Sequence, residues 1–139
     1  MKRVILLSLG LLALFGTGVW AQDARIVQYG RQLSRLFVQD GLTIETGMAA
    51  DGTQNLAVLA NSGYFPLQLT AKAGIPSTLR VYTDRTYDCS RAFFLPDFNQ
   101  KAGLPVKGVK AFAIPAQKKG ATLFGTCGMG MYTFEIRFE

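Results

Sequence analysis

Three sulfur-bearing side chains lie close together near the end of the chain, in the segment Gly125-Thr126-Cys127-Gly128-Met129-Gly130-Met131. Cys127, Met129 and Met131 are two residues apart, so an extended backbone would place all three on one face. The glycines between them also permit a tight bend that would bring the sulfurs together. The only other cysteine is Cys89, and the sequence has no histidine. Thiolate and thioether ligands select Cu(I) over harder ions, so these residue types predict a Cu(I) site.

Two more ordinary interpretations of the same residues stay open. Two cysteines in an exported chain most often form a structural disulfide, and methionine is most often a core residue. A Cys89–Cys127 disulfide in a non-enzymatic β-sandwich binding module is therefore the alternative, although it does not explain Met129 and Met131 beside Cys127. A reversible dithiol is disfavoured because the two cysteines do not form a Cys-x-x-Cys motif.

No arrangement of residues typical of an enzyme is visible. Without histidine the chain cannot form a Ser-His or Cys-His pair. It also has no glycine-rich phosphate-binding motif. After the first three residues, the basic side chains are scattered and Lys118-Lys119 is their only adjacent pair, which argues against nucleic acid as a partner. The sequence therefore predicts a protein that is not an enzyme.

Residues 1–21 have the pattern of a secretory signal peptide. The basic pair Lys2-Arg3 precedes an apolar run over residues 4–15, and Val19-Trp20-Ala21 supplies small residues for cleavage after Ala21. The run is interrupted before the roughly 20 apolar residues that a membrane span needs, which favours cleavage over an uncleaved anchor. We therefore expect a periplasmic or secreted protein, at the membrane only if this segment is retained. Removing its two basic residues lowers the formal net charge from +6 to +4.

Residues 22–50 are interpreted as an N-terminal extension. Its first part has apolar residues spaced like one face of a helix, although an edge strand is an alternative: Ile26, Tyr29, Leu33, Leu36 and Phe37. Residues 42–46 then alternate apolar and polar side chains, as a half-buried strand does.

Residues 51–139 are interpreted as one domain of short strands separated by glycine and proline. We expect strands in seven segments: 55–60, 64–70, 78–83, 86–94, 109–114, 121–126 and 132–138. A long connection marked by Pro96, Gly103, Pro105 and Gly108 separates the fourth strand from the fifth. In the last strand, Phe134, Ile136 and Phe138 share one face. This pattern predicts an all-β sandwich.

Several segments resemble the cupredoxin-like Cu(I)-binding domain of bacterial copper chaperones and copper-resistance proteins. They are Gly63-Tyr64-Phe65-Pro66, Ala73-Gly74-Ile75-Pro76, Asp88-Cys89-Ser90-Arg91, Phe94-Leu95-Pro96-Asp97-Phe98 and Cys127-Gly128-Met129-Gly130-Met131. The resemblance covers about residues 54–139 and implies a Greek-key β-sandwich. A blue copper site needs two histidines and a cysteine, and this chain has no histidine. The resemblance therefore implies the Cu(I)-binding branch rather than the electron-transfer branch.

The resemblance also implies individual roles. Cys89, Cys127, Met129 and Met131 would be the Cu(I) ligands, and relatives can hold two ions bridged by the thiolates. The implied function is copper tolerance or copper delivery, with a copper-transporting ATPase or an oxidase as donor or acceptor. Met48 lies in the extension, outside the resemblance, and gets no role from it.

Two arginines, Arg85 and Arg91, flank Cys89 in the sequence. They are either ordinary surface charges or guanidinium groups that lower the pKa of nearby thiols. The second interpretation predicts a contact between an arginine and the sulfur site.

Overall fold

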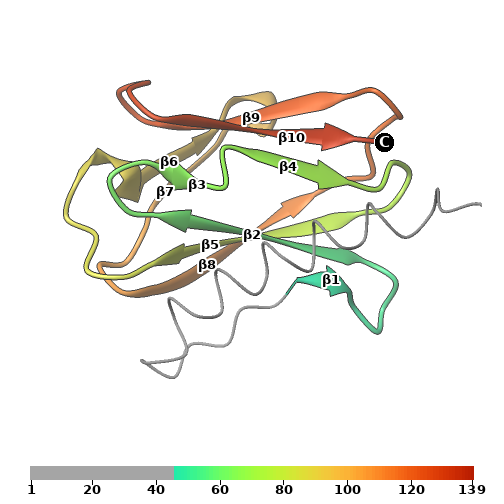
Figure 1. Cartoon of the computed structure of the whole chain (residues 1–139), viewed down its shortest axis with the longest axis horizontal. Helices are drawn as coiled ribbons and strands as arrows, with labels where there is room; N and C mark the ends of the chain where they lie inside the picture. Colours follow the sequence, from blue (N-terminus) through green and yellow to red (C-terminus); the bar gives the residue numbers. More distant parts are fainter. Residues whose placement is uncertain (1–45) are drawn as a thin grey trace, which may run out of the picture.

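The structure is a computed structural model that describes residues 46–139. The predicted signal peptide and residues 22–45 of the predicted extension, with their helical and strand patterns, lie outside these residues. The described chain is built of strands and two short 3₁₀ turns, arranged as two facing sheets of five strands each (Figure 1). The predicted all-β sandwich is confirmed. Within residues 46–139, no helix is long and apolar enough to cross a membrane.

The first sheet has the order β1-β2-β5-β8, with β3 also paired to β2. These strands are β1 (Gly47–Met48), β2 (Gln54–Ala60), β3 (Tyr64–Phe65), β5 (Ser77–Thr83) and β8 (Gly108–Ile114). The second sheet has the order β4-β10-β9-β6-β7. Its strands are β4 (Gln68–Ala71), β6 (Ala92–Leu95), β7 (Gln100–Gly103), β9 (Thr122–Cys127) and β10 (Thr133–Phe138). The pairs β2–β5 and β4–β10 are parallel, and the others are antiparallel.

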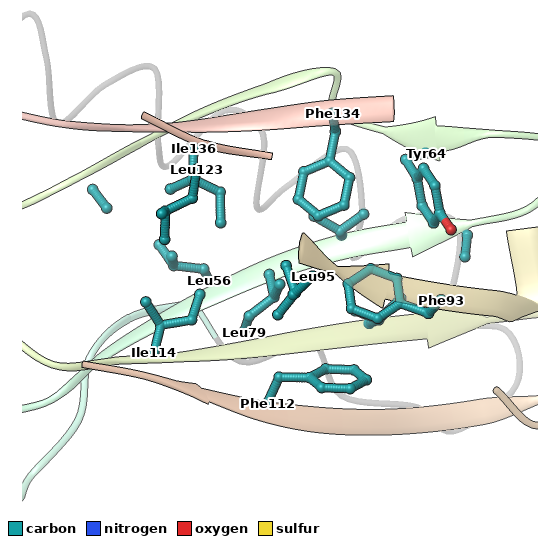
Figure 2. Close-up of a cluster of buried hydrophobic side chains, with 14 of the residues drawn as sticks. Leu56, Tyr64, Leu79, Phe93, Leu95, Phe112, Ile114, Leu123, Phe134 and Ile136 are labelled. Atoms are coloured by element: carbon teal, nitrogen blue, oxygen red, sulfur yellow. The ribbon is translucent and has the colours of Figure 1, made fainter. Parts of the chain in front are cut away.

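The core lies between the two sheets, because alternate residues of each strand point inward (Figure 2). Phe134, Ile136 and Phe138 of β10 are all buried, as their alternation predicted. Toward one end of this core, four aromatic rings pack together. The ring centroids of Phe93 and Phe112 are 4.6 Å apart, and those of Tyr64 and Phe134 are 5.2 Å apart. Contacts of this kind give the domain a core of its own.

Three predictions about the middle of the chain are wrong. Residues 64–70 are not one strand, because β3 pairs with β2 in the first sheet and β4 pairs with β10 in the second. Residues 86–94 are not one strand, because the Asp88 side chain accepts the N–H of Ser90 and caps the 3₁₀ turn η2 (Cys89–Arg91) before β6 begins. The connection between residues 96 and 108 contains a second turn, η3 (Pro96–Phe98), followed by β7, which pairs with β6. The sequence of β7, Gln-Lys-Ala-Gly, lacks the β-branched and aromatic residues that mark strands.

Gly125 occupies a position in β9 where a larger residue does not fit. It lies directly across from Phe134 in the β9–β10 pairing, and an added Cβ would fall far inside van der Waals contact with the buried Phe134 ring. We expect Gly125→Ala to lower the free energy of unfolding by about 1–3 kcal/mol, as overpacking usually does. Urea denaturation measures this change.

The control for that substitution is Gly128→Ala, in the same glycine-rich segment but just after β9. A Cβ at Gly128 would lie 3.5 Å from the Cβ of Ala92, an ordinary contact. We expect its unfolding free energy to stay near that of the wild type. If both substitutions lower the unfolding free energy equally, the contact with the Phe134 ring is not the cause.

Candidate metal centre

Strand pairing brings Cys89 and Cys127 together although they are far apart in the sequence. Cys127 ends β9, and Phe93 of β6 lies across from it. The N–H of Gly128 donates to the carbonyl oxygen of Ala92 at 2.6 Å, which extends this pairing by one step. Cys89 lies in η2, immediately before β6, and is therefore carried to the same end of the sandwich. Both cysteines are free thiols in this structure.

The two cysteine side chains are hydrogen-bonded to each other. The Cys89 thiol donates and the Cys127 sulfur accepts, since this contact raises the pKa of Cys89 and lowers that of Cys127. Cys89 is half-buried, whereas Cys127 is only 1% exposed. Two soft donors are thus held within one hydrogen bond of each other, with one of them reachable from solvent.

The loop after Cys127 wraps its backbone around the Cys127 sulfur. The N–H groups of Tyr132, Met129 and Met131 all donate to that sulfur. Gly130 adopts a positive φ of 70° and donates its N–H to the Cys127 carbonyl oxygen at 2.9 Å, which closes the turn. A tight turn of this kind is what the glycine-rich sequence permits.

These contacts give the two thiols opposite pKa shifts. Burial raises the pKa of Cys127, but the N–H donors of Tyr132 and Met129 and the Cys89 thiol outweigh it, so the pKa of Cys127 is lowered. The pKa of Cys89 is raised by burial, by its hydrogen bond and proximity to Cys127, and by Asp88. The Cys127 thiol therefore loses its proton more readily than the Cys89 thiol.

The two methionine side chains lie at the surface beside this pair. Met129 is 75% exposed and Met131 is 64% exposed, although the N–H groups of the same residues contact the Cys127 sulfur. The structure thus brings the two thiols together and leaves both thioethers in solvent next to them.

Two residues outside the predicted ligand set, Asp88 and Tyr64, hold the Cys89 segment in place. Asp88 accepts the N–H of Ser90 at 2.8 Å and that of Ser62 at 2.9 Å, so it ties η2 to the turn after β2. The buried Tyr64 hydroxyl donates to the carbonyl oxygen of Ser90 at 3.0 Å. Burial, followed by the charges of Cys127, Cys89 and Asp88, raises the pKa of Tyr64 well above its usual range, so the hydroxyl stays a donor. Hydrogen bonds to backbone groups of a folded loop cannot be predicted from a sequence pattern. The only indication in the sequence is the presence of serine and aspartate, which are typical of turns.

The predicted role of the flanking arginines receives no support. The Nε of Arg91 donates to the carbonyl oxygen of Leu104 at 3.0 Å, and Arg85 pairs with Asp84 at 3.4 Å. The groups that lower the pKa of Cys127 are backbone N–H groups and the Cys89 thiol. Backbone N–H groups, and not the predicted guanidinium groups, therefore lower the pKa of Cys127.

Asp88 should make the stability of the domain depend on pH. Although burial raises its pKa, the hydrogen bonds from Ser90 and Ser62 outweigh burial, and the pKa of Asp88 is lowered from its ordinary value of 3.8. A lowered pKa stabilises the fold above the unfolded value of about 3.9, and this contribution is lost as the pH falls through the folded value. We expect Asp88→Asn to lower stability at pH 7 by about 0.5–1.5 kcal/mol, because the amide nitrogen that takes the place of one carboxylate oxygen cannot accept an N–H as that oxygen does.

The measurement is urea denaturation of both proteins between pH 7 and pH 3. The difference in unfolding free energy between wild type and Asp88→Asn should shrink at the acid end, because protonated Asp88 no longer accepts both N–H groups well. If the difference in unfolding free energy stays constant with pH, the charge of Asp88 does not contribute to the stability of the domain.

A conventional metal cluster is absent from the described residues. Across residues 46–139 no three His, Cys, Asp or Glu side chains gather to hold an ion. A metal at Cys89 and Cys127 would have two thiolates as its charged ligands, and the thioethers of Met129 and Met131 in the loop after Cys127 are further soft donors. Such a donor set suits a soft ion of low charge and not Mg²⁺, Ca²⁺ or Mn²⁺.

Comparisons with known proteins show what the fold is similar to. No family model and no curated protein match the sequence. Among solved structures, the chain is similar to the metal-binding domain of the Cu(I)-exporting P-type ATPase CopA of Streptococcus pneumoniae D39, solved with Cu(I). That match has a TM-score of 0.56 and 22% identity, and covers 71% of this chain and 99% of the domain. A copper-binding protein solved in its apo form matches with a TM-score of 0.59 and 22% identity, covering 68% and 96%. Identities this low show a shared fold.

Proposed function

We propose that this chain binds Cu(I) as its cargo through the sulfurs of Cys89 and Cys127, and that it serves copper tolerance or copper delivery. The observation that carries the proposal is the pair of hydrogen-bonded cysteine side chains, in which backbone N–H groups lower the pKa of Cys127. Copper would replace the proton that Cys89 donates to Cys127. The charge of Cu⁺ then balances one thiolate, and the N–H groups around Cys127 offset the negative charge of the second.

The exposed methionines fit a role in capture and release. Thioethers are neutral soft donors that bind Cu(I) weakly, so Met129 and Met131 can pass an ion between solvent or a partner and the thiols. Their side chains have the exposure that such a transfer needs. A copper-transporting ATPase or an oxidase is the proposed donor or acceptor, and the solved metal-binding domain of a copper-exporting ATPase supports the first. We also propose that the protein is exported, to the periplasm or beyond, after cleavage of residues 1–21.

Anaerobic competition against a chromophoric Cu(I) chelator tests the proposal. The reduced protein should take up Cu(I) without the intense visible absorption of blue copper, because the site has no histidine and Cu(I) is d¹⁰. Failure of the reduced wild type to withdraw Cu(I) from a weak chelator would contradict the proposal.

The methionines should matter less than the cysteines. We expect Met131→Leu to weaken Cu(I) binding by less than about tenfold, or 1.4 kcal/mol, because it removes a neutral donor and no charge. Met48→Leu is the matched control, since Met48 is also an exposed methionine, at 52%, but pairs with Gln54 at the start of β2, away from the sulfurs. Its affinity should equal that of the wild type. An equal loss of Cu(I) affinity in both variants would show that Met131 is not part of the copper site.

A further inference from the structure

The segment Ala60–Tyr64, which joins the end of β2 to β3, is hydrogen-bonded to the segment that carries Cys89. Three of its residues bond to the residues 26 positions further along the chain, through two donated side-chain hydroxyls and one backbone N–H that donates to a carboxylate. The pairs are Ala60 with Thr86 at 2.7 Å, Ser62 with Asp88 at 2.9 Å, and Tyr64 with Ser90 at 3.0 Å. Because the bonds recur at every second residue, they hold the chain on both sides of Cys89.

The Ala60–Tyr64 segment also contacts the residues around Cys127. Gly63 lies against the ring of Tyr132, since a Cβ at Gly63 would be 3.7 Å from that ring. The carbonyl oxygen of Tyr132 accepts the N–H of Cys127 at 3.1 Å. On the core side, the Tyr64 ring packs against Phe93 with the ring centroids 5.9 Å apart, and Phe93 lies across from Cys127 in the β6–β9 pairing. One segment that supplies no sulfur thus touches the supports of both cysteines.

The two sulfur atoms are held beside each other without a bond between them. Cys89 and Cys127 are free thiols whose side chains are hydrogen-bonded. The sulfurs of a disulfide are about 2.05 Å apart. Two metal–sulfur bonds of about 2.3 Å each, the length found with zinc, leave the sulfurs up to about 4.6 Å apart. Hydrogen-bonded thiols must therefore move together to form a disulfide, but they can take a metal ion between them without approaching each other.

We propose that the Ala60–Tyr64 segment positions Cys89 at a distance from Cys127 that suits a bound Cu(I) ion and opposes formation of a disulfide. This inference rests on the proposed function, since it takes Cu(I) as the ion. The three hydrogen bonds resist movement of the Cys89 segment, and the contact of Gly63 with Tyr132 fixes the segment against the Cys127 loop. Weakening these bonds frees Cys89 to move, so Cu(I) should bind less tightly and the disulfide should form more readily.

The test variant is Tyr64→Phe, which keeps the ring but removes the hydroxyl that donates to Ser90. Loss of a partner that orients a metal ligand typically costs 10- to 100-fold in affinity, and we expect Cu(I) binding to weaken by about tenfold. Anaerobic competition against a Cu(I) chelator measures this change. Adding Thr86→Val, which removes a second hydroxyl of the same set, should weaken binding further.

A second readout needs no copper. In a glutathione buffer, the dithiol of the apo-protein and one oxidised glutathione give the Cys89–Cys127 disulfide and two reduced glutathiones. Acid quenching followed by intact mass measures the two forms of the protein at equilibrium. We expect the equilibrium to shift several-fold toward the disulfide in Tyr64→Phe, and further in the double variant with Thr86→Val.

Two control variants separate positioning from general stability. Tyr87→Phe is the same substitution two residues before Cys89, but Tyr87 is 77% exposed and its hydroxyl makes no hydrogen bond within residues 46–139. Ile114→Val trims the core at the other end of the sandwich, away from Tyr64 (Figure 2). Neither control should change the copper affinity or the disulfide equilibrium. Thermal unfolding shows which variants are folded, and if Tyr64→Phe is not, Thr86→Val alone replaces it.

The proposal requires weaker copper binding and a more stable disulfide in the same variant. An unchanged copper affinity or an unchanged disulfide equilibrium in the double variant would overturn it. A loss of both would also overturn it, because the segment would then only bring the thiols together and not keep them apart. If the wild type does not bind Cu(I) at all, the proposed function fails, and the glutathione equilibrium still decides whether the segment opposes the disulfide.

Discussion

Replacing Cys127 with serine should weaken Cu(I) binding by more than about a hundredfold. Even the loss of a partner that only orients a metal ligand typically lowers metal affinity 10- to 100-fold, and Cys127 is proposed as a ligand itself. Serine keeps the size of the side chain but removes the soft, charged donor on which three backbone N–H groups converge. The measurement is anaerobic competition with a Cu(I) chelator of known affinity.

The comparison with Met131→Leu makes this test specific. Both variants alter the same loop, but only Cys127→Ser removes a thiolate, so its loss of affinity should be far larger. Thermal unfolding of the apo proteins checks that both are folded. If Cys127→Ser and wild type hold Cu(I) equally well, the metal does not bind at this loop.

Copper and oxidation should stabilise the reduced apo-protein in mutually exclusive ways. Bound Cu(I) stabilises the folded state by mass action, by about 4 kcal/mol when free copper exceeds the dissociation constant a thousandfold. A Cys89–Cys127 disulfide would join residues 38 positions apart and stabilise by roughly 3–4 kcal/mol from chain entropy. For a domain of about 100 residues, each kilocalorie shifts the melting temperature by roughly 4 °C or more. Reduced apo-protein should therefore be folded but the least stable form.

Cys89→Ser should diminish both responses together, because one sulfur takes part in both. Differential scanning calorimetry with and without Cu(I), and after oxidation, measures them. Oxidised wild type should also fail to take up copper until it is reduced. If Cys89→Ser abolishes the effect of oxidant but leaves the copper-induced rise intact, Cys89 is only a structural cysteine.

The strands that were predicted well are those whose side chains alternate strongly. In β10 the alternation of Phe134, Ile136 and Phe138 with polar residues identifies both the strand and its buried face. In β7 the residues are small or polar, and only pairing with β6 makes them a strand. η2 was missed for a related reason, since its start depends on a hydrogen bond that the Asp88 side chain makes in the folded chain.

The candidate site was predictable in its chemistry but not in its geometry. Residue types alone indicated soft ligands at Cys89 and Cys127. Their contact depends on the register of β6 against β9, which no local pattern encodes. Likewise the glycines indicated a tight loop, but not that its N–H groups would point at the Cys127 sulfur and replace the arginines as the source of positive potential.

The most direct test of Cu(I) binding by the two cysteines is X-ray absorption at the copper edge of protein loaded anaerobically with one equivalent of Cu(I). We expect copper in the Cu(I) state with sulfur neighbours only, and a clearly altered sulfur shell in Cys127→Ser. A first shell of nitrogen or oxygen in the wild type, or a spectrum that Cys89→Ser and Cys127→Ser both leave unchanged, would contradict it.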